Sequence, residues 1–304
     1  MNGTLTNWIL LISLSAVWGS SFILMKLGMQ TTSGEAIFTH TQVAALRIAL
    51  AGIFLLPFAI SGIRKLSKRN IVLLSLVGFF GNFFPAFLFT FSETGISTGY
   101  AGMLNSCTPI FALIIGFIIF KDRLTRIQVI GVAIGTVGII GLTLAGQDLS
   151  IKGSWIHIIA VVAATFCYAV SLNTIRHTLQ HLKSLEITSL SFLIILLPAI
   201  MISVQSGVAN IFKTNPHAWT GFGYIALLSA IGTALAVVLF NKLIANSSVL
   251  FASSVTYLIP IVAVLIGLGF NERINRWQIL SMLVILIGVF VANVIGKKRL
   301  LRKV

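Results

Sequence analysis

Long apolar runs alternate with short polar breaks along the whole chain, and this pattern predicts an all-α membrane protein. Each run has about the 20 apolar residues that a helix needs to cross a hydrocarbon core of roughly 30 Å. Ten such runs cover residues 8–28, 41–62, 70–91, 97–120, 126–144, 154–175, 185–205, 217–243, 248–270 and 275–296. Because unpaired backbone groups are too costly in lipid, we expect these runs to form ten transmembrane helices.

The composition agrees with a lipid environment. The chain is 57% hydrophobic and 9% charged, with a mean hydropathy of +1.04, whereas a soluble domain carries about 25% charged residues. So few charges cannot cover a water-facing surface. The first run follows no basic segment and precedes no clear cleavage site, so we expect a retained helix rather than a signal peptide.

The net charge of +15 reflects membrane topology rather than nucleic-acid binding, because the basic residues cluster between apolar runs and at the C-terminus. With the N-terminus in the cytoplasm, roughly three times as many Lys and Arg lie on the cytoplasmic side as on the other. This bias predicts a multi-pass protein of the cytoplasmic (inner) membrane, with both termini in the cytoplasm.

The two halves of the sequence resemble each other at an offset of about 150 residues. Residues 17–26 match 167–176, and residues 120–140 match 270–290. The matches pair Trp18 with Tyr168, Ser21 with Ser171, Lys26 with Arg176, Asp122 with Glu272, and Gly138 with Gly288.

Because each half holds five runs, its odd number reverses the orientation of the second half. The sequence therefore predicts two inverted five-helix repeats, at residues 1–146 and 147–296, followed by a basic cytoplasmic tail at 297–304. Inverted repeats are a recurring plan of secondary transporters, whose solute site lies near the midplane between the repeats.

Several of these features resemble one known family. They are Trp-Gly at 18–19, Leu-Arg at 46–47, and a proline followed about twelve residues later by an acidic residue and Arg in the fourth and ninth runs. Together they resemble the drug/metabolite transporter (DMT) superfamily, and most closely its EamA-like ten-helix branch with two EamA domains. The resemblance covers nearly the whole chain. It implies a ten-helix inverted-repeat fold and transport of amino acids, metabolites or drugs, often outward. Tyr168–Ala169 departs from the Trp-Gly pattern in the second half.

Two prolines lie about eleven residues into the fourth and ninth runs, at Pro109 and Pro260. A proline inside a helix frees the carbonyl four residues earlier, which here belongs to Asn105 and Thr256. This pattern indicates either a matched pair of substrate-facing kinks or gating hinges, or structural kinks satisfied by neighbouring helices.

Polar and aromatic residues recur near the middle of several runs, and a cavity for a small amphipathic solute combines such groups. Trp18 and Ser21 share a helix face because they lie three residues apart, and Tyr168 and Ser171 repeat this spacing. The alternative role is hydrogen bonding between helices. The candidate substrate-binding residues are Trp18, Ser21, Asn82, Asn105, Tyr168, Ser171, Asn241, Thr256 and Tyr257.

Charge within a span is costly and therefore a functional hypothesis by default. Arg47 lies in the second run. Its functional role would be to pair with a carboxylate solute. Its structural role would be to reach the outer interface or to bind Glu35 or a helix C-terminus, and we favour a structural role. Glu93 ends the third run and is the best candidate for a proton relay. Asp122 and Glu272 each precede an arginine, so we expect local ion pairs there.

Other chemistry has little support. No Walker loop, HExxH motif or GxSxG elbow occurs, and Cys107 and Cys167 sit in apolar runs as small hydrophobic residues. We predict no catalytic residue, metal or cofactor. Glycines at 131, 135, 138 and 141 predict close helix packing.

The leading hypothesis is a secondary transporter that moves a small amphipathic metabolite, amino acid or drug by alternating access, with export favoured. The alternatives are a passive facilitator and a membrane enzyme acting on lipid-linked substrates, although the enzyme lacks clustered carboxylates or histidines at one face. The expected partners are the lipid bilayer and the small-molecule substrate, with no nucleic acid. The sequence leaves monomer and homodimer open.

Overall fold

The computed structural model describes residues 2–145, 154–246 and 255–292, and this part of the chain is helical. Its single β feature is an isolated bridge between Gln30 and Ala36. The elements are α1 (Asn2–Met29), α2 (His40–Gly62), η1 (Ile63–Lys65), α3 (Lys68–Gly78), η2 (Phe79–Phe83), α4 (Phe84–Ser92), α5 (Thr98–Asn105), α6 (Thr108–Ile118), α7 (Arg126–Ala145), α8 (Ser154–Thr178), α9 (Ser184–Gln205), α10 (Val208–Thr214), α11 (Ala218–Leu227), η3 (Leu228–Leu235), α12 (Ala236–Asn246), α14 (Val255–Gly269) and α15 (Arg276–Phe290).

The described helices have the length and surface of a membrane bundle. Seven continuous helical stretches are long and apolar enough to cross a membrane, and three more, Arg126–Leu142, Leu258–Gly269 and Arg276–Phe290, are apolar but shorter. Large apolar side chains cover the outside: Ile118, Val137 and Val204 are 67%, 66% and 73% exposed. These observations confirm an all-α membrane protein, while the count of ten spanning helices stays a prediction.

Within the described residues, the third, fourth and eighth predicted runs are interrupted rather than uniform. The third run contains the π-helical segment η2 between α3 and α4, and the eighth contains the π-helical segment η3 between α11 and α12. The fourth run is divided into α5 and α6 by a turn at Ser106–Cys107. The two π-helical segments lie about 150 residues apart, and such segments are frequent at functional sites.

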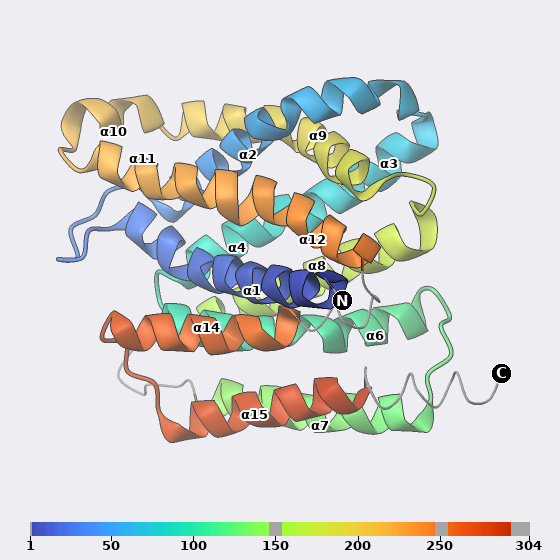
Figure 1. Ribbon diagram of the computed structural model, residues 1–304. Helices are drawn as coiled ribbons and strands as arrows, with labels where there is room; N and C mark the ends of the chain where they lie inside the picture. Colours follow the sequence, from blue (N-terminus) through green and yellow to red (C-terminus); the bar gives the residue numbers. More distant parts are fainter. Residues whose placement is uncertain (1, 146–153, 247–254, 293–304) are drawn as a thin grey trace.

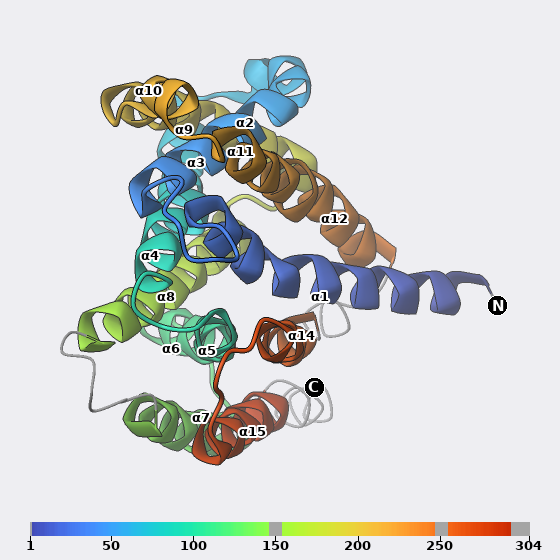
Figure 2. The same cartoon turned by 90° about the vertical axis from the view of Figure 1, so that its left-hand side faces the viewer.

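Helices at corresponding places in the two halves of the sequence make corresponding contacts. Helix α7 lies along α15 and α2 along α9, as Figure 1 shows. Helix α1 packs against α14, and its counterpart α8 packs against α6. Figure 2 shows α7 and α15 as a pair at one edge of the bundle, beyond α5, α6 and α14.

The contact between α1 and α14 explains why the Trp-Gly motif has a glycine at position 19. A Cβ at Gly19 would lie 2.6 Å from Cβ of Val262 and 3.1 Å from the carbonyl oxygen of Ile259. Because α14 approaches this closely, position 19 leaves no room for a side chain. Ala169, the counterpart on α8, is fully buried but keeps its methyl group.

The glycine pattern of α7 serves the packing that the sequence predicts. A Cβ at Gly138 would lie 2.7 Å from the backbone nitrogen of Ile285. A Cβ at Gly288 would lie 2.7 Å from the carbonyl oxygen of Gly131 and 2.7 Å from Cα of Gly135. Close approach of two backbones through small residues is a main source of helix association in lipid. The expected close packing of α7 is therefore confirmed, with α15 as its partner.

We predict that Gly288→Ala lowers the thermal unfolding midpoint of the purified protein, because the neighbouring atoms belong to backbone and cannot move aside. The expected cost is about 1–3 kcal/mol, the usual range for overpacking a tight core. Gly223→Ala is the matched control, since a Cβ there meets nothing within 4 Å. Equal midpoints for the two variants contradict the prediction.

Candidate functional site

The first helix crosses the π-helical segment η3 through two of the predicted site residues. The indole Nε1 of Trp18 donates a hydrogen bond to the carbonyl oxygen of Gly232 at 3.0 Å. Ser21 faces the same glycine, because a Cβ at Gly232 would lie 3.0 Å from the Ser21 hydroxyl oxygen. Trp18 also packs edge-on against Phe240, with ring centroids 5.1 Å apart. The face that Trp18 and Ser21 share is thus directed at the irregular backbone of the eighth run.

The sixth run repeats this crossing with the first half of the chain. Ser171 on α8 is 4% exposed, and a Cβ at Gly81 in η2 would collide with its hydroxyl oxygen. Tyr168 contacts Phe89 with ring centroids 5.9 Å apart. Ser21 and Ser171 therefore occupy equivalent positions, since each faces a glycine in a π-helical segment of the other half.

The remaining described polar candidates lie on three different elements. Asn82 is half-buried within η2, Asn105 is half-buried at the end of α5, and Thr256 is half-buried at the start of α14. The side chains of Asn241 and Tyr257 lie outside the described residues.

The two matched prolines have different surroundings. Pro109 lies in the first turn of α6, because the fourth run is interrupted just before it. The backbone oxygen of Asn105, which a continuous helix would have left free, accepts a hydrogen bond from the Thr108 hydroxyl at 2.9 Å. Pro260 lies inside α14, whose preceding residues 247–254 fall outside the described part. The kink is thus a helix break in the first half and an interior proline in the second.

Four buried polar side-chain atoms of the described residues have no hydrogen-bond partner: Nε of Arg47, both carboxylate oxygens of Glu93, and Oδ1 of Asn105. Such atoms are rare, because burying an unpaired polar group costs on the order of 1–3 kcal/mol or more. They come from α2, from the residue that follows α4, and from α5. A solute or water with complementary groups would satisfy them.

Arg47 does not take the local partner proposed from the sequence. Its Nη1 donates to the sulfur of Met25 at 3.4 Å, whereas Glu35 pairs with Nε2 of His217 at 3.1 Å. The alternative that Arg47 binds Glu35 is therefore wrong, because the loop that carries Glu35 lies against the start of α11.

Glu93 lines a cavity of about 660 Å³ at the C-terminal end of α1. The lining residues are Lys26, Met29, Gln30, Ala36, Phe38, Thr39, His40, Glu93, Thr94, Gly95, Ile96 and Ser97. Glu93 is 6% exposed and follows the end of the Lys68–Ser92 span. Burial raises the pKa of this carboxyl well above its usual value, and nearby Glu272 raises it further, against the opposing effect of Lys26 and Arg47. Of the residues predicted from sequence, Glu93 alone lines this cavity.

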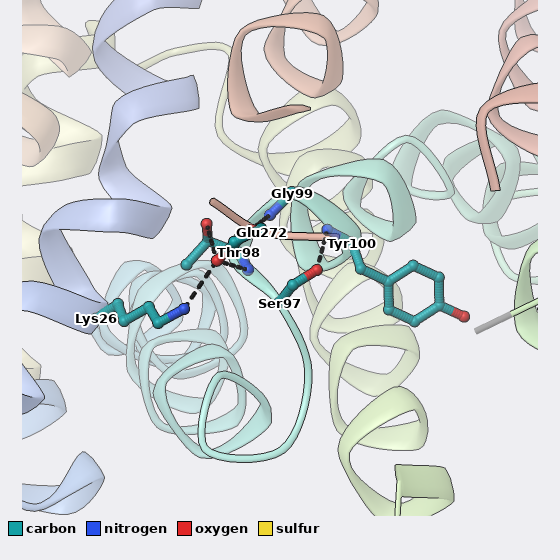
Figure 3. A network of polar contacts seen from close by, with 6 residues as sticks. All are labelled: Lys26, Ser97, Thr98, Gly99, Tyr100 and Glu272. Atoms are coloured by element: carbon teal, nitrogen blue, oxygen red, sulfur yellow. Dashed lines mark hydrogen bonds and ion pairs between the residues drawn. The ribbon is translucent and has the colours of Figure 1, made fainter. Parts of the chain in front are cut away.

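Beside the cavity lies the buried carboxylate of Glu272, for which the sequence predicts a local ion pair. Glu272 does not pair with Arg273; it binds Nζ of Lys26 at 2.9 Å. It also accepts hydrogen bonds from the backbone nitrogen and hydroxyl of Thr98 and from the backbone nitrogen of Gly99, at 3.0, 2.9 and 2.9 Å. Figure 3 shows these contacts converging on the carboxylate from α1 and the start of α5.

This arrangement holds Glu272 in its charged form. Burial by itself would raise the pKa of Glu272, but the hydrogen bonds from Gly99, Lys26 and Thr98 outweigh burial and keep it below its usual value. The sequence contained a signal for this network: basic residues recur at 26 and 176, and acidic residues at 122 and 272, at one offset. The sequence did not show that Lys26 is the partner of Glu272, because the two residues lie far apart along the chain.

A helical bundle with similar contacts in its two halves and with polar groups inside it is a recurring plan among membrane transporters. The chain belongs to the EamA-like transporter family, whose model matches residues 6–144 and again residues 155–294. The resemblance to the drug/metabolite transporter superfamily noted from the motifs is confirmed, and the protein is a transporter rather than an enzyme.

Individual relatives match over most of their length. The uncharacterized inner membrane transporter YedA of Escherichia coli K12 is 26% identical over 94% of this chain and 90% of its own. A probable amino-acid metabolite efflux pump of Salmonella typhimurium is 26% identical over 92% of each chain. A probable terminal-alkyne amino-acid exporter of Streptantibioticus cattleyicolor is 24% identical over 86% of this chain and 83% of its own.

Solved structures share the fold, and one of them is a crystal structure described only as that of a protein. That crystal structure superimposes with a TM-score of 0.61 over 96% of this chain and 97% of its own, at 13% sequence identity. At that identity the likeness concerns the fold alone.

We predict that the two members of the α8–η2 crossing are energetically coupled. Gly81→Ala places a methyl group against the Ser171 hydroxyl and should destabilise the protein, whereas Ser171→Ala removes that hydroxyl and should recover part of the loss. The expected coupling is about 0.5–3 kcal/mol, the range for residues in contact. Thermal unfolding of the single and double variants measures it, and additive effects would show that the crossing is looser than described.

Proposed function

We propose that this protein is a secondary transporter of the inner membrane that moves a small amphipathic metabolite by alternating access, with export as the favoured direction. The observation that carries the proposal is the set of unpaired buried atoms of Arg47, Glu93 and Asn105. In an apolar bundle their cost persists unless a bound solute or water satisfies them, and intramembrane charge usually marks a solute pathway.

The chemistry of these atoms indicates the kind of solute. A guanidinium, a carboxyl and an amide oxygen together suit a molecule with charged or polar groups, while the rings of Trp18 and Tyr168 suit an apolar part. The relatives from S. typhimurium and S. cattleyicolor are named for amino-acid metabolites and terminal-alkyne amino acids. These names support amino-acid-like metabolites as the first solutes to test.

The proposal includes ten spanning helices arranged as two inverted repeats, with both termini in the cytoplasm. Its support is the matched pairs of contacts, α1 with α14 and α8 with α6, together with the twofold match of the family model. The excess of Lys and Arg on one side of the predicted spans supports the orientation. In such a fold the solute site lies between the repeats and opens to one side at a time.

Counterflow in proteoliposomes tests the proposal directly. Vesicles loaded with an unlabelled solute should accumulate the same labelled solute transiently and saturably, in a screen of amino acids, nucleosides and cationic drugs. A passive facilitator with a channel-like path would give no counterflow peak. Failure of every solute class, with enzymatic turnover by folded protein instead, would reject transport.

Asn105→Ala should lower the initial counterflow rate by about tenfold, because the loss of a contact worth about 1.4 kcal/mol changes a rate that much. Asn210→Ala is the matched control, since Asn210 lies exposed on α10. Expression and thermal midpoint of both variants should remain close to those of the parent. A parallel loss of transport and folded yield would indicate a packing role for Asn105.

Glu93→Gln should remove a pH dependence of stability. Because the pKa of Glu93 is raised in the folded protein, the native state binds its proton more tightly than the unfolded chain does. The parent is therefore stabilised at low pH and loses that contribution as pH rises through the raised pKa. The variant should have the higher melting temperature above that pKa and a flatter pH profile. Glu35→Gln, at a carboxylate 65% exposed, is the control; equal profiles for all three proteins would contradict the prediction.

A further inference from the structure

We propose that two ion pairs, Lys26 with Glu272 and Arg176 with Asp122, are matched latches at opposite faces of the bundle that open in alternation. The inference rests on the proposed alternating access and assigns the residues that control it. Each pair joins the two halves of the chain: Lys26 belongs to the first half and Glu272 to the second, whereas Arg176 belongs to the second and Asp122 to the first.

The acidic members occupy the same kind of turn. Lys121 and Asn271, immediately before Asp122 and Glu272, both have positive φ, at 57° and 59°. A positive φ is uncommon outside glycine, so its recurrence immediately before each carboxylate is a feature that the two turns share.

Each turn directs its carboxylate back toward a glycine of the preceding helix. The backbone nitrogen of Asp122 donates to the oxygen of Gly116, and that of Glu272 donates to the oxygen of Gly267, both at 2.9 Å. A Cβ on Gly116 would lie 3.0 Å from Oδ2 of Asp122, and one on Gly267 would lie 2.5 Å from Oε2 of Glu272. The glycines therefore make room for the carboxylates at both faces.

The basic members lie in the last turns of α1 and α8, which are counterparts in the two halves. In Figure 1 the turn between α14 and α15, which carries Glu272, and the turn between α6 and α7, which carries Asp122, lie at opposite ends of the bundle. A rocking motion that widens one end would separate one pair while the other stays formed.

The two latches are not equally tight in this conformation. The Glu272 side chain is 4% exposed and its distance to Nζ of Lys26 is 2.9 Å, with further donors from α5. Nη1 of Arg176 lies 3.7 Å from Oδ2 of Asp122, and the two side chains are 67% and 30% exposed. Nε2 of the neighbouring His177 lies 3.4 Å from the same oxygen, so the contacts of Asp122 are fewer and longer than those of Glu272. A buried, fully hydrogen-bonded pair holds its geometry, whereas an exposed one contributes little. The described conformation thus has the Lys26 latch closed and the Arg176 latch loosened.

A third ion pair provides a contrast. Lys65 binds Glu186 at 2.8 Å, but the equivalent positions in the other half, Asn215 and Ala36, carry no charge. Next to those positions Glu35 pairs with His217 at 3.1 Å, so this contact also recurs in both halves. Because neither Lys65 nor Glu186 belongs to the turn after α6 or the turn after α14, Glu186→Gln serves as the control for an ion pair between the halves outside those turns.

The test is cysteine labelling of purified full-length protein in lipid nanodiscs, where a hydrophilic maleimide reaches both faces. In a background with Cys107→Ala and Cys167→Ala, the reporters are Met29→Cys and Leu179→Cys. Each lies three residues beyond the basic member of its latch, and Met29 and Leu179 are 8% and 0% exposed. Labelling needs no substrate, so its outcome is independent of whether a solute has been found by counterflow.

Glu272→Gln should raise the labelling rate of Met29→Cys by about fivefold and lower that of Leu179→Cys, the scale of a typical coupling between sites. Asp122→Asn should produce the reverse, and Glu186→Gln should change neither. If Glu272→Gln does not fold, Lys26→Met releases the same latch. Rates that rise together at both reporters, or that do not change, overturn the proposal, because a purely structural ion pair has no reason to couple the faces with opposite sign.

Discussion

Lipid offers no hydrogen bonds to a protein backbone, and the rest of this structure depends on that constraint. Each regular helix satisfies its own backbone groups, so irregular backbone is tolerated where a polar side chain satisfies the groups that it frees. The carbonyl of Gly232 in a π-helical segment receives the indole of Trp18, and the break before Pro109 is satisfied by Thr108. The first departure marks a place where helices from different parts of the chain meet, whereas the second is satisfied within its own run.

The same constraint gives meaning to the atoms that remain unpaired. Arg47, Glu93 and Asn105 lie in an interior where unsatisfied polar groups are costly. Glu272, by contrast, is buried with Lys26, Thr98 and Gly99 as partners and stays charged. One carboxyl is stabilised by a complete set of donors and the other is not, which separates a structural charge from a group available to solute or proton.

The similarity between the two halves of the sequence extends to the contacts that their residues make. Ser21 and Ser171 meet glycines in corresponding π-helical segments, and Asp122 and Glu272 leave corresponding turns toward basic residues of the opposite half. The repeats are similar but not equal: the Trp-Gly pair has become Tyr-Ala, and one ion pair is buried while the other is exposed. Two similar halves with differently packed ion pairs are what we expect of a protein that closes its two membrane faces in turn.

The sequence by itself determined the elements and their order. Apolar runs set the helices, the offset of 150 residues indicated the repeat, and the glycines of α7 indicated close packing, because each of these depends on local periodicity or short spacing. It did not locate the π-helical segments or the break at Ser106–Cys107, which a hydropathy pattern does not distinguish from regular helix.

Only the tertiary structure decided which charged groups meet. Arg123 and Arg273, the sequence neighbours of Asp122 and Glu272, are not their partners; Glu272 binds Lys26 across 246 positions of the chain. The reason is physical: an ion pair depends on which helix ends the packing brings together, and α1 reaches the turn after α14 because Gly19 lets these two helices approach.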